Sequence, residues 1–191
     1  MSKISLGKQV FLYPMPVVLL GTMWENRPNF MAAGWISRVN YNPPLIGAGI
    51  GKSHLSADSI LECNAFSINF PPSRLMVETD HCGLVSGRDV DKSGVFSIFF
   101  GELEKVPMVR ESTLALECRL ERTIDLGSNY LFIGEIVQSY SEDKYLTDGK
   151  PDIVKMDPLL LSMPDNNYWK VGEKAGTAWK DGLKYRKEGS L

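Results

Sequence analysis

The residues best suited to chemistry lie in the segment "GIGKSHLSADS", residues 49–59. The segment is similar to the end of a nucleotide-binding P-loop, because Gly51, Lys52 and Ser53 follow one another. A P-loop also needs a glycine at position 46, and this chain has Ile46 there. The segment is therefore not a P-loop, and the question is whether it still binds a phosphate.

The same segment has the residue types of an anion site. Lys52 supplies a positive charge, and Ser53 and Ser56 supply hydroxyl groups. A helix is expected over 56–63 with Ser56 as its N-cap, and helix N-termini attract anions through unpaired amides and the helix dipole. These residues fit a phosphate monoester, although a glycine-rich turn before an ordinary capped helix would have the same sequence.

Two further segments have features of a ligand site. In "RPNFMAAGW", residues 27–35, three small residues precede Trp35, so that a flat ligand could lie against the backbone; a tightly packed strand crossing would have the same pattern. In "CGLVSGRDVDK", residues 82–92, a Ser-Gly turn is followed by Arg88 and Lys92. Those cations either belong to a solvated loop or face an anion.

Other motifs of catalysis are missing from the sequence. His54 and His81 are the only histidines, and neither belongs to an HExxH or EF-hand motif. There is no GxSxG nucleophile elbow and no GxGxxG opening a long helix. No metal site is expected. An enzyme built on this chain would take its chemistry from a cofactor, so no side chain is assigned as catalytic.

Cysteine usage gives no disulfide framework. The three cysteines, Cys63, Cys82 and Cys118, include no CxxC pair, which argues against a structural zinc and against a thioredoxin-like site. They are expected to be small buried hydrophobic residues. Cys82, next to His81, is the one candidate for redox reactivity.

Composition limits the classes of partner and location. The 191 residues suit one domain, and a formal charge of −2 gives no electrostatic reason to bind nucleic acid. The apolar stretch at 10–21 is broken by Pro14 and Pro16 and is too short to span a bilayer. No small-residue cleavage site follows it, so a cytoplasmic protein without a membrane segment is expected.

Hydrophobic periodicity predicts a mostly β protein with short helices. In "LALECRLE", residues 114–121, Leu116 and Cys118 face one way while Glu117 and Arg119 face the solvent. Short, closely punctuated strands favour a closed or nearly closed barrel, which leaves few exposed edges. Strands are expected over 16–22, 29–35, 44–50, 65–70, 114–121 and 130–140, with final strands at 158–161 and 167–172 and helices at 56–63 and 73–87.

Several segments together resemble one known family. They are "YPMPVVLLGT", "RPNFMAAGW", "NPPLIGAGIGKSHLS", "INFPP", "CGLVSGRDVDK", "LECRL" and "LGSNYLFIGEI". Their order and spacing are similar to those of the flavin reductase-like, FMN-binding split-barrel proteins, especially the flavoredoxin branch. The resemblance runs from about residue 8 to about residue 176 of a single domain and leaves a C-terminal tail at 177–191.

The resemblance implies a six-stranded split barrel, usually a homodimer, that holds FMN non-covalently near the subunit interface. It implies that the backbone of residues 31–34 runs along the edge of the flavin ring beside Trp35. It also implies that Lys52 and Lys92, with nearby serines, hold the phosphate, so that removing both lysines leaves a folded protein with little flavin. The implied cofactor residues are Asn29, Met31, Ala32, Ala33, Gly34, Trp35, Lys52, Ser53, Ser56, Ser86 and Lys92.

The chain also departs from its relatives. Asn129 stands where many of them have a histidine, and asparagine cannot exchange a proton near neutral pH. Met163 lies where relatives often place an aromatic residue over the flavin. The resemblance implies an NADH- or NADPH-linked oxidoreductase or flavin reductase with a small-molecule or protein redox partner. The alternatives are a non-catalytic FMN electron carrier reduced by a partner protein, and a β-barrel without flavin.

Overall fold

A seven-stranded antiparallel sheet forms the body of the protein. The computed structural model describes residues 1–185. The strand order is β3-β2-β6-β9-β10-β5-β4. Their bounds are Arg27–Ala33, Val18–Trp24, Ala65–Phe70, Leu114–Asp125, Asn129–Ser141, Leu45–Gly51 and Ile36–Asn40, in that order. The fold is therefore mostly β, as predicted, although the sheet has one strand more than the resemblance implied.

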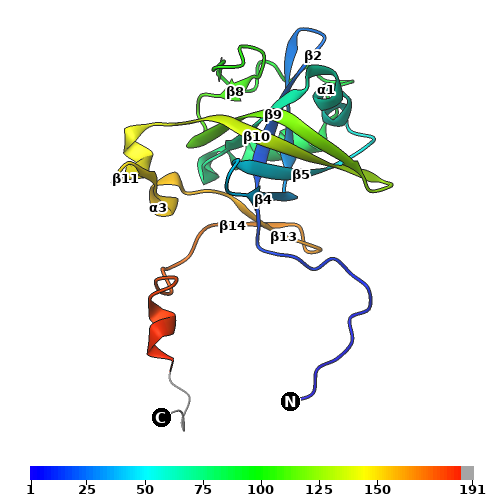
Figure 1. Ribbon diagram of the computed structural model, residues 1–191. Helices are drawn as coiled ribbons and strands as arrows, with labels where there is room; N and C mark the ends of the chain where they lie inside the picture. Colours follow the sequence, from blue (N-terminus) through cyan, green and yellow to red (C-terminus); the bar gives the residue numbers. More distant parts are fainter. Residues whose placement is uncertain (186–191) are drawn as a thin grey trace.

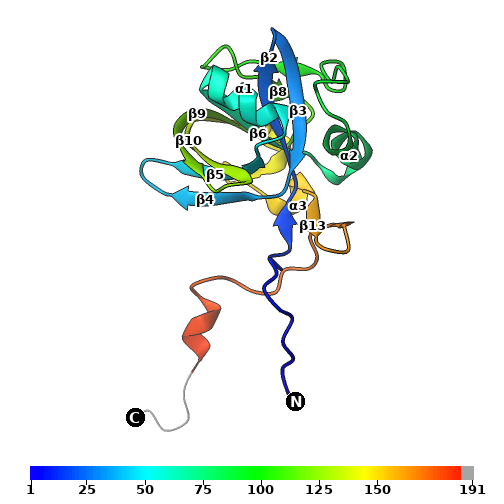
Figure 2. The same ribbon diagram turned by 90° about the vertical axis from the view of Figure 1, so that its right-hand side faces the viewer.

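The sheet curls into a barrel that stays open between its two edge strands (Figures 1 and 2). These strands, β3 and β4, are consecutive in the chain but do not pair with each other. Residues 34 and 35 connect them, so the small-residue segment crosses the opening of the barrel. The opening leaves one edge of β3 without a partner strand.

The barrel interior is filled by alternate side chains of its strands. Leu116 and Cys118 of β9 belong to the main core cluster with Phe66 and Phe132. The expectation that Glu117 faces solvent is wrong, because this residue is fully buried. Its carboxylate accepts hydrogen bonds from the backbone amides of Glu102 and Leu103 at 2.8 and 2.9 Å, so the loop before β8 (Met108–Val109) covers it.

Two helices flank the β2–β3 hairpin. Helix α1 spans Leu55–Cys63 and α2 spans Met76–Leu84, preceded by the 3-10 turn Ser73–Leu75. Both were predicted, but Ser56 is not the N-cap of α1. The N-cap is His54, and Ser56 is buried within the first turn, where its hydroxyl accepts a hydrogen bond from Asn29 Nδ2 at 3.1 Å.

Several smaller elements lie outside the main sheet. A three-stranded sheet joins β1 (Met15–Pro16), β13 (Leu160–Ser162) and β14 (Asn167–Trp169). Tyr168 donates a hydrogen bond to Asp80 at 2.7 Å, which ties β14 to α2. The remaining elements are β7 (Ile98–Phe99), β8 (Met108–Val109), η2 (Asp143–Tyr145), β11 (Leu146–Thr147), β12 (Lys150–Pro151), α3 (Ile153–Met156) and η3 (Asp181–Lys184).

Both ends of the described chain project from the body. The N-terminal arm, residues 1–14, and the C-terminal segment, residues 170–185, leave from the side of the barrel that carries β4, β13 and β14 (Figures 1 and 2). Within residues 1–185, no helix is long and apolar enough to cross a lipid bilayer.

The packing around Gly21 in the middle of β2 makes a testable prediction. A Cβ added there would lie 2.5 Å from the Pro107 carbonyl oxygen and 2.4 Å from Ser67 Oγ. Because one neighbour is backbone, Gly21→Ala should destabilise the fold by about 1–3 kcal/mol or more. Urea unfolding measures this. Gly94→Ala, whose added Cβ has no neighbour within 4 Å, is the matched control, and equal stability of the two variants would contradict the packing.

Candidate cofactor site

A polar cavity of about 220 Å³ lies between the start of α1 and the end of α2. No carboxylate is among the described residues that line it. Its walls are Asn29, Met31, Ser53, His54, Leu55, Ser56, Cys82, Gly83, Leu84, Val85, Ser86, Gly87 and Lys92. This combination of one ammonium group, hydroxyls and a helix start suits an anion.

Lys92 supplies the charge of this cavity from a buried position. The residue is only 3% exposed, and its ammonium group donates hydrogen bonds to the carbonyl oxygens of Phe30 and Cys82, both at 2.9 Å. Burial lowers the pKa of Lys92 below its ordinary value. An ammonium has three N–H groups, so one remains for an anion in the cavity. Among the described residues, no carboxylate lies within hydrogen-bond distance of this buried ammonium group, so its positive charge is not neutralised by the protein.

Asn29 presents a buried amide with an unused atom to the same cavity. The residue is 5% exposed, and its Nδ2 donates to Ser56 Oγ, while its Oδ1 has no partner among the described atoms. The Ser56 hydroxyl can donate as well as accept, so exchanging the amide nitrogen and oxygen would direct an N–H group to the cavity. A buried amide atom without a partner requires an explanation, and a ligand in the cavity would supply one.

The first turn of α1 leaves the amides of Leu55 and Ser56 without a backbone acceptor among the described residues, whereas the Ala57 amide donates to the His54 carbonyl at 3.0 Å. The N-cap residue His54 makes no side-chain capping bond, so the α1 N-terminus lacks the usual internal acceptor. The His54 ring instead lies over Gly51, where an added Cβ would be 3.0 Å from Cδ2. Gly51 is paired with Asn129 across the β5–β10 ladder. The structure thus places the His54 imidazole at the rim of the cavity, over the residue that pairs with Asn129.

The unpaired edge of β3 runs from this cavity across the barrel opening. The Phe30 carbonyl reaches Lys92 on that edge, and successive residues of a strand direct their backbone groups to opposite edges. Ala32 therefore presents its N–H and C=O to the same open edge. Gly83 of α2 approaches closely, since a Cβ added to it would lie 3.1 Å from Ala32 Cβ. This edge of β3 has no partner strand, so its backbone groups can form hydrogen bonds with a planar ligand.

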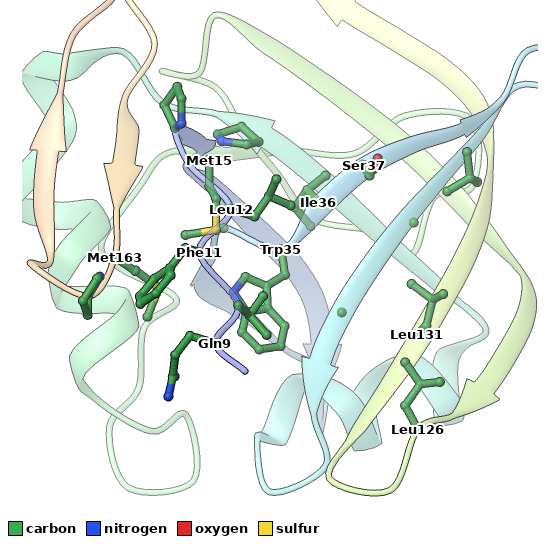
Figure 3. A pocket seen from close by; sticks show the side chains of 18 residues that line it. Gln9, Phe11, Leu12, Met15, Trp35, Ile36, Ser37, Leu126, Leu131 and Met163 are labelled. Carbon is green, nitrogen blue, oxygen red and sulfur yellow. The ribbon is translucent and has the colours of Figure 1, made fainter. Parts of the chain in front are cut away.

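A larger, apolar cavity of about 700 Å³ begins where β3 ends (Figure 3). Gly34 and Trp35 lie in its wall together with Leu131 of β10 and Met163 of the β13–β14 turn. Residues 9–12 of the N-terminal arm form another part of the wall, where Phe11 and Leu12 approach Trp35 and Met163 in the close view. Trp35 is 52% exposed. Its indole is thus available to a flat ligand.

The structure brings together most of the residues predicted from the sequence. Ala32 and Ala33 lie on β3 between the two cavities, and Gly34 and Trp35 reach the apolar one. Lys52 lines neither. Its ammonium group donates to Asp125 Oδ1 at 2.6 Å and lies 4.7 Å from the centre of the Tyr130 ring. Six predicted residues line the polar cavity: Asn29, Met31, Ser53, Ser56, Ser86 and Lys92.

Seven of the residues that line the polar cavity were not predicted as site residues, and His54 and Gly87 are the most informative of them. His54 directly follows the predicted Ser53 and is separated by one residue from the predicted Ser56, and this position was the only available signal. Gly87 is required by close packing, because an added Cβ would lie 2.2 Å from Asn29 Oδ1. The redox candidate Cys82 is fully buried, and burial raises the pKa of its thiol to about 11, so the reactive thiolate is scarce at neutral pH.

The lowered pKa of Lys92 predicts a pH dependence of stability. The Lys92 ammonium has its ordinary pKa of 10.5 in the unfolded chain and a lower pKa in the folded protein. Between these two pKa values the unfolded chain binds more protons, so the free energy of unfolding falls as the pH decreases through this window. The difference in unfolding free energy between wild type and Lys92→Met should therefore grow in favour of wild type as pH rises through this window. Urea unfolding from pH 7 to 11 measures it, and a pH-independent difference would contradict the burial of a charged Lys92.

Comparisons with known proteins agree with this architecture. A flavoredoxin from Methanosarcina acetivorans is 55% identical, with a TM-score of 0.93 over 95% of this chain and 98% of that one. The flavoredoxin of Desulfovibrio vulgaris (Miyazaki F) is 34% identical, with a TM-score of 0.88 over 95% of this chain and all (100%) of that one. An FMN-binding protein from Thermus thermophilus is 27% identical, with a TM-score of 0.80 over 93% of this chain and 97% of that one. Residues 10–161 match the model of the flavin reductase like domain, and the chain belongs to that family.

Proposed function

We propose that the protein binds FMN without a covalent bond, with the phosphate in the polar cavity and the ring system along β3. The observation that carries this proposal is the buried Lys92 ammonium in a cavity that has no carboxylate and that Asn29, whose Oδ1 lacks a partner, also lines. Ser53, Ser56 and Ser86 add hydroxyl groups there. Relatives named for flavins and for FMN support the choice of ligand.

The dimensions of β3 agree with this placement. From Asn29 to Gly34, one residue beyond the end of β3, an extended chain advances by about 17 Å at about 3.3 Å per residue, comparable with an extended flavin mononucleotide. The ribityl chain would follow Met31, and the polar edge of the ring would pair with the backbone groups of Ala32. The dimethyl end would reach Gly34 and Trp35. This path joins the polar cavity to the apolar one.

The free energies explain why the phosphate site matters. Burying roughly 200 Å² of apolar ring contributes about 5 kcal/mol at about 25 cal/mol per Å². Association costs on the order of 4–15 kcal/mol. Hydrogen bonds to charged groups, at about 1.5–3 kcal/mol each, must supply much of the remainder. The phosphate contacts therefore decide retention, and riboflavin, which lacks the phosphate, should bind weakly.

For the activity, we propose an oxidoreductase that takes electrons from NADH or NADPH. A bound flavin supplies the hydride and electron chemistry, and this chain's own residues position it and leave one face accessible. The apolar cavity beside Trp35 is large enough for a second planar ring. A second candidate, an electron carrier reduced by a protein, is favoured by the two flavoredoxin relatives and by Asn129, which cannot exchange a proton.

We also propose that the protein forms a homodimer. The family resemblance implies one, and the outer side of β4 supports it. Trp35, Val39 and Tyr41 are 52%, 46% and 81% exposed there, although all three are large apolar side chains. Such a patch is typical of a surface that another protein covers.

The phosphate assignment predicts unequal effects of two lysine substitutions. Lys92→Met should weaken FMN binding at least ~10-fold, since a charge-assisted hydrogen bond is worth about 1.5–3 kcal/mol. Lys52→Met should have a smaller effect, because Lys52 is paired with Asp125. Fluorescence titration of each apoprotein with FMN measures this, and circular dichroism verifies the folds.

Two controls make this result specific. Lys105→Met removes a surface lysine that also donates to a backbone carbonyl, that of Cys63 at 2.8 Å, and should leave FMN affinity unchanged. Riboflavin affinity should fall less than FMN affinity in Lys92→Met, because riboflavin has no phosphate for Lys92 to hold. If Lys92→Met binds FMN as tightly as wild type, the phosphate does not occupy the polar cavity.

The two candidate activities are separated by one anaerobic experiment. Mixing the FMN-loaded protein with NADH or NADPH should bleach the visible flavin band on the time scale of turnover if the protein is a nicotinamide-linked oxidoreductase. An unchanged spectrum, with bleaching by dithionite as the control that the flavin is reducible, would contradict that activity and support the carrier.

A further inference from the structure

The C-terminal segment, residues 170–185, is locally structured but barely attached to its own barrel. Its last side-chain tie to the body is the ion pair between Lys170 and Asp157 at 3.2 Å. Beyond it, the described hydrogen bonds are internal to the segment. The Thr177 amide donates to Asp181 Oδ2 at 2.6 Å, Asp181 pairs with Lys184 at 2.7 Å, and η3 follows. The segment is therefore an arm that ends in a small ordered turn.

This turn carries large apolar side chains that its own subunit leaves uncovered. Trp179, Leu183 and Tyr185 are 97%, 81% and 75% exposed. Trp179 also has a φ of 57°, a left-handed conformation that bulky residues rarely adopt. Burying apolar side chains of this size away from water stabilises the structure that buries them. An ordered turn that displays three of them is suited to contact with another surface.

The surface that fits lies on the side of the barrel from which the arm departs. There, β4 and the residues that flank it expose Trp35, Val39 and Tyr41, and two of these, Trp35 and Val39, line the apolar cavity. The subunit's own N-terminal arm already forms one wall of that cavity, and the C-terminal segment leads away from it in both views (Figures 1 and 2). An arm that leaves an apolar face without returning to it can reach the same face of a second copy.

We infer that the turn at 177–185 of each subunit packs its apolar side chains on the β4 face of a second copy of this chain. The inference rests on the homodimer proposed above and names the element that holds it together. In a two-fold dimer this contact occurs twice, because the turn of each subunit packs on the β4 face of the other. Trp35 lies on that face, so the arm of one subunit borders the flavin site of the other.

The first test measures mass and dissociation. Light scattering after gel filtration should give twice the chain mass of 21.3 kDa. The triple variant Trp179→Ser, Leu183→Ser, Tyr185→Ser should dissociate at a concentration at least ~10-fold higher than wild type, because its apolar contacts are gone. The matched control replaces Val77, Ile153 and Val154 by serine, residues that are 70%, 55% and 76% exposed on α2 and α3. This control should dissociate as wild type does.

A cross-link then identifies the surface on which the arm lies. Full-length Trp179→Cys and Val39→Cys, mixed and oxidised, should yield a disulfide-linked pair that contains one chain of each variant. A chain carrying both substitutions should cross-link between chains rather than within one.

Each outcome has one meaning. A monomeric wild type overturns the homodimer and the arm contact together. A dimer whose triple variant dissociates like the control leaves the homodimer and overturns the arm contact. A cross-link formed only within one chain shows that the arm folds back on its own subunit. This result also overturns the arm contact between subunits. Selective weakening with cross-links between chains supports the inference.

Discussion

The ammonium group of Lys92 is the interaction on which the site depends. It joins the Phe30 carbonyl on the open edge of β3 to the Cys82 carbonyl near the end of α2, with both bonds at 2.9 Å. Without it, two buried carbonyls would lose their partner and the wall between strand and helix would lose its tie. Burying a cation without a carboxylate is costly, and that cost is offset if an anion occupies the cavity beside it.

The open barrel has two regions that can bind different parts of one ligand, a polar cavity and an apolar cavity. The opening between β3 and β4 leaves one strand edge without a partner, which proteins usually cover. One end of that edge meets a polar cavity and the other an apolar one. A ligand with a phosphate at one end and a planar ring at the other satisfies both ends and the edge between them. This complementarity supports the proposal that the ligand is FMN.

Much of the fold could be predicted from the sequence because its strands are buried on a regular face. The strand at 65–70 was predicted with its observed bounds, and 114–121 and 130–140 lie within β9 and β10. Strand β4 was missed, because "ISRVN" is mostly exposed and its apolar residues do not mark a core. Glu117 was placed in solvent, because a covering loop from residues 100–105 leaves no trace in the alternation of β9.

The candidate site was predicted less completely than the strands. Ser56 has the residue type of an N-cap, yet its hydroxyl is used by Asn29, which lies 27 residues earlier in the chain. Lys52 and Lys92 are both lysines beside serines, and only the tertiary structure shows that one is paired with Asp125 while the other is buried in the cavity. Local sequence gives the residue types of a site. Pairing across the fold decides which of them remain available to a ligand.

The most direct test of the central claim is the ³¹P resonance of FMN bound to the protein, followed as a function of pH. A phosphate held against Lys92 and the first turn of α1 should be shifted from the free position and should stay dianionic well below its ordinary second pKa of about 6. A bound flavin whose phosphate resonance titrates as free FMN does would show that the phosphate lies in solvent, and the account would be contradicted.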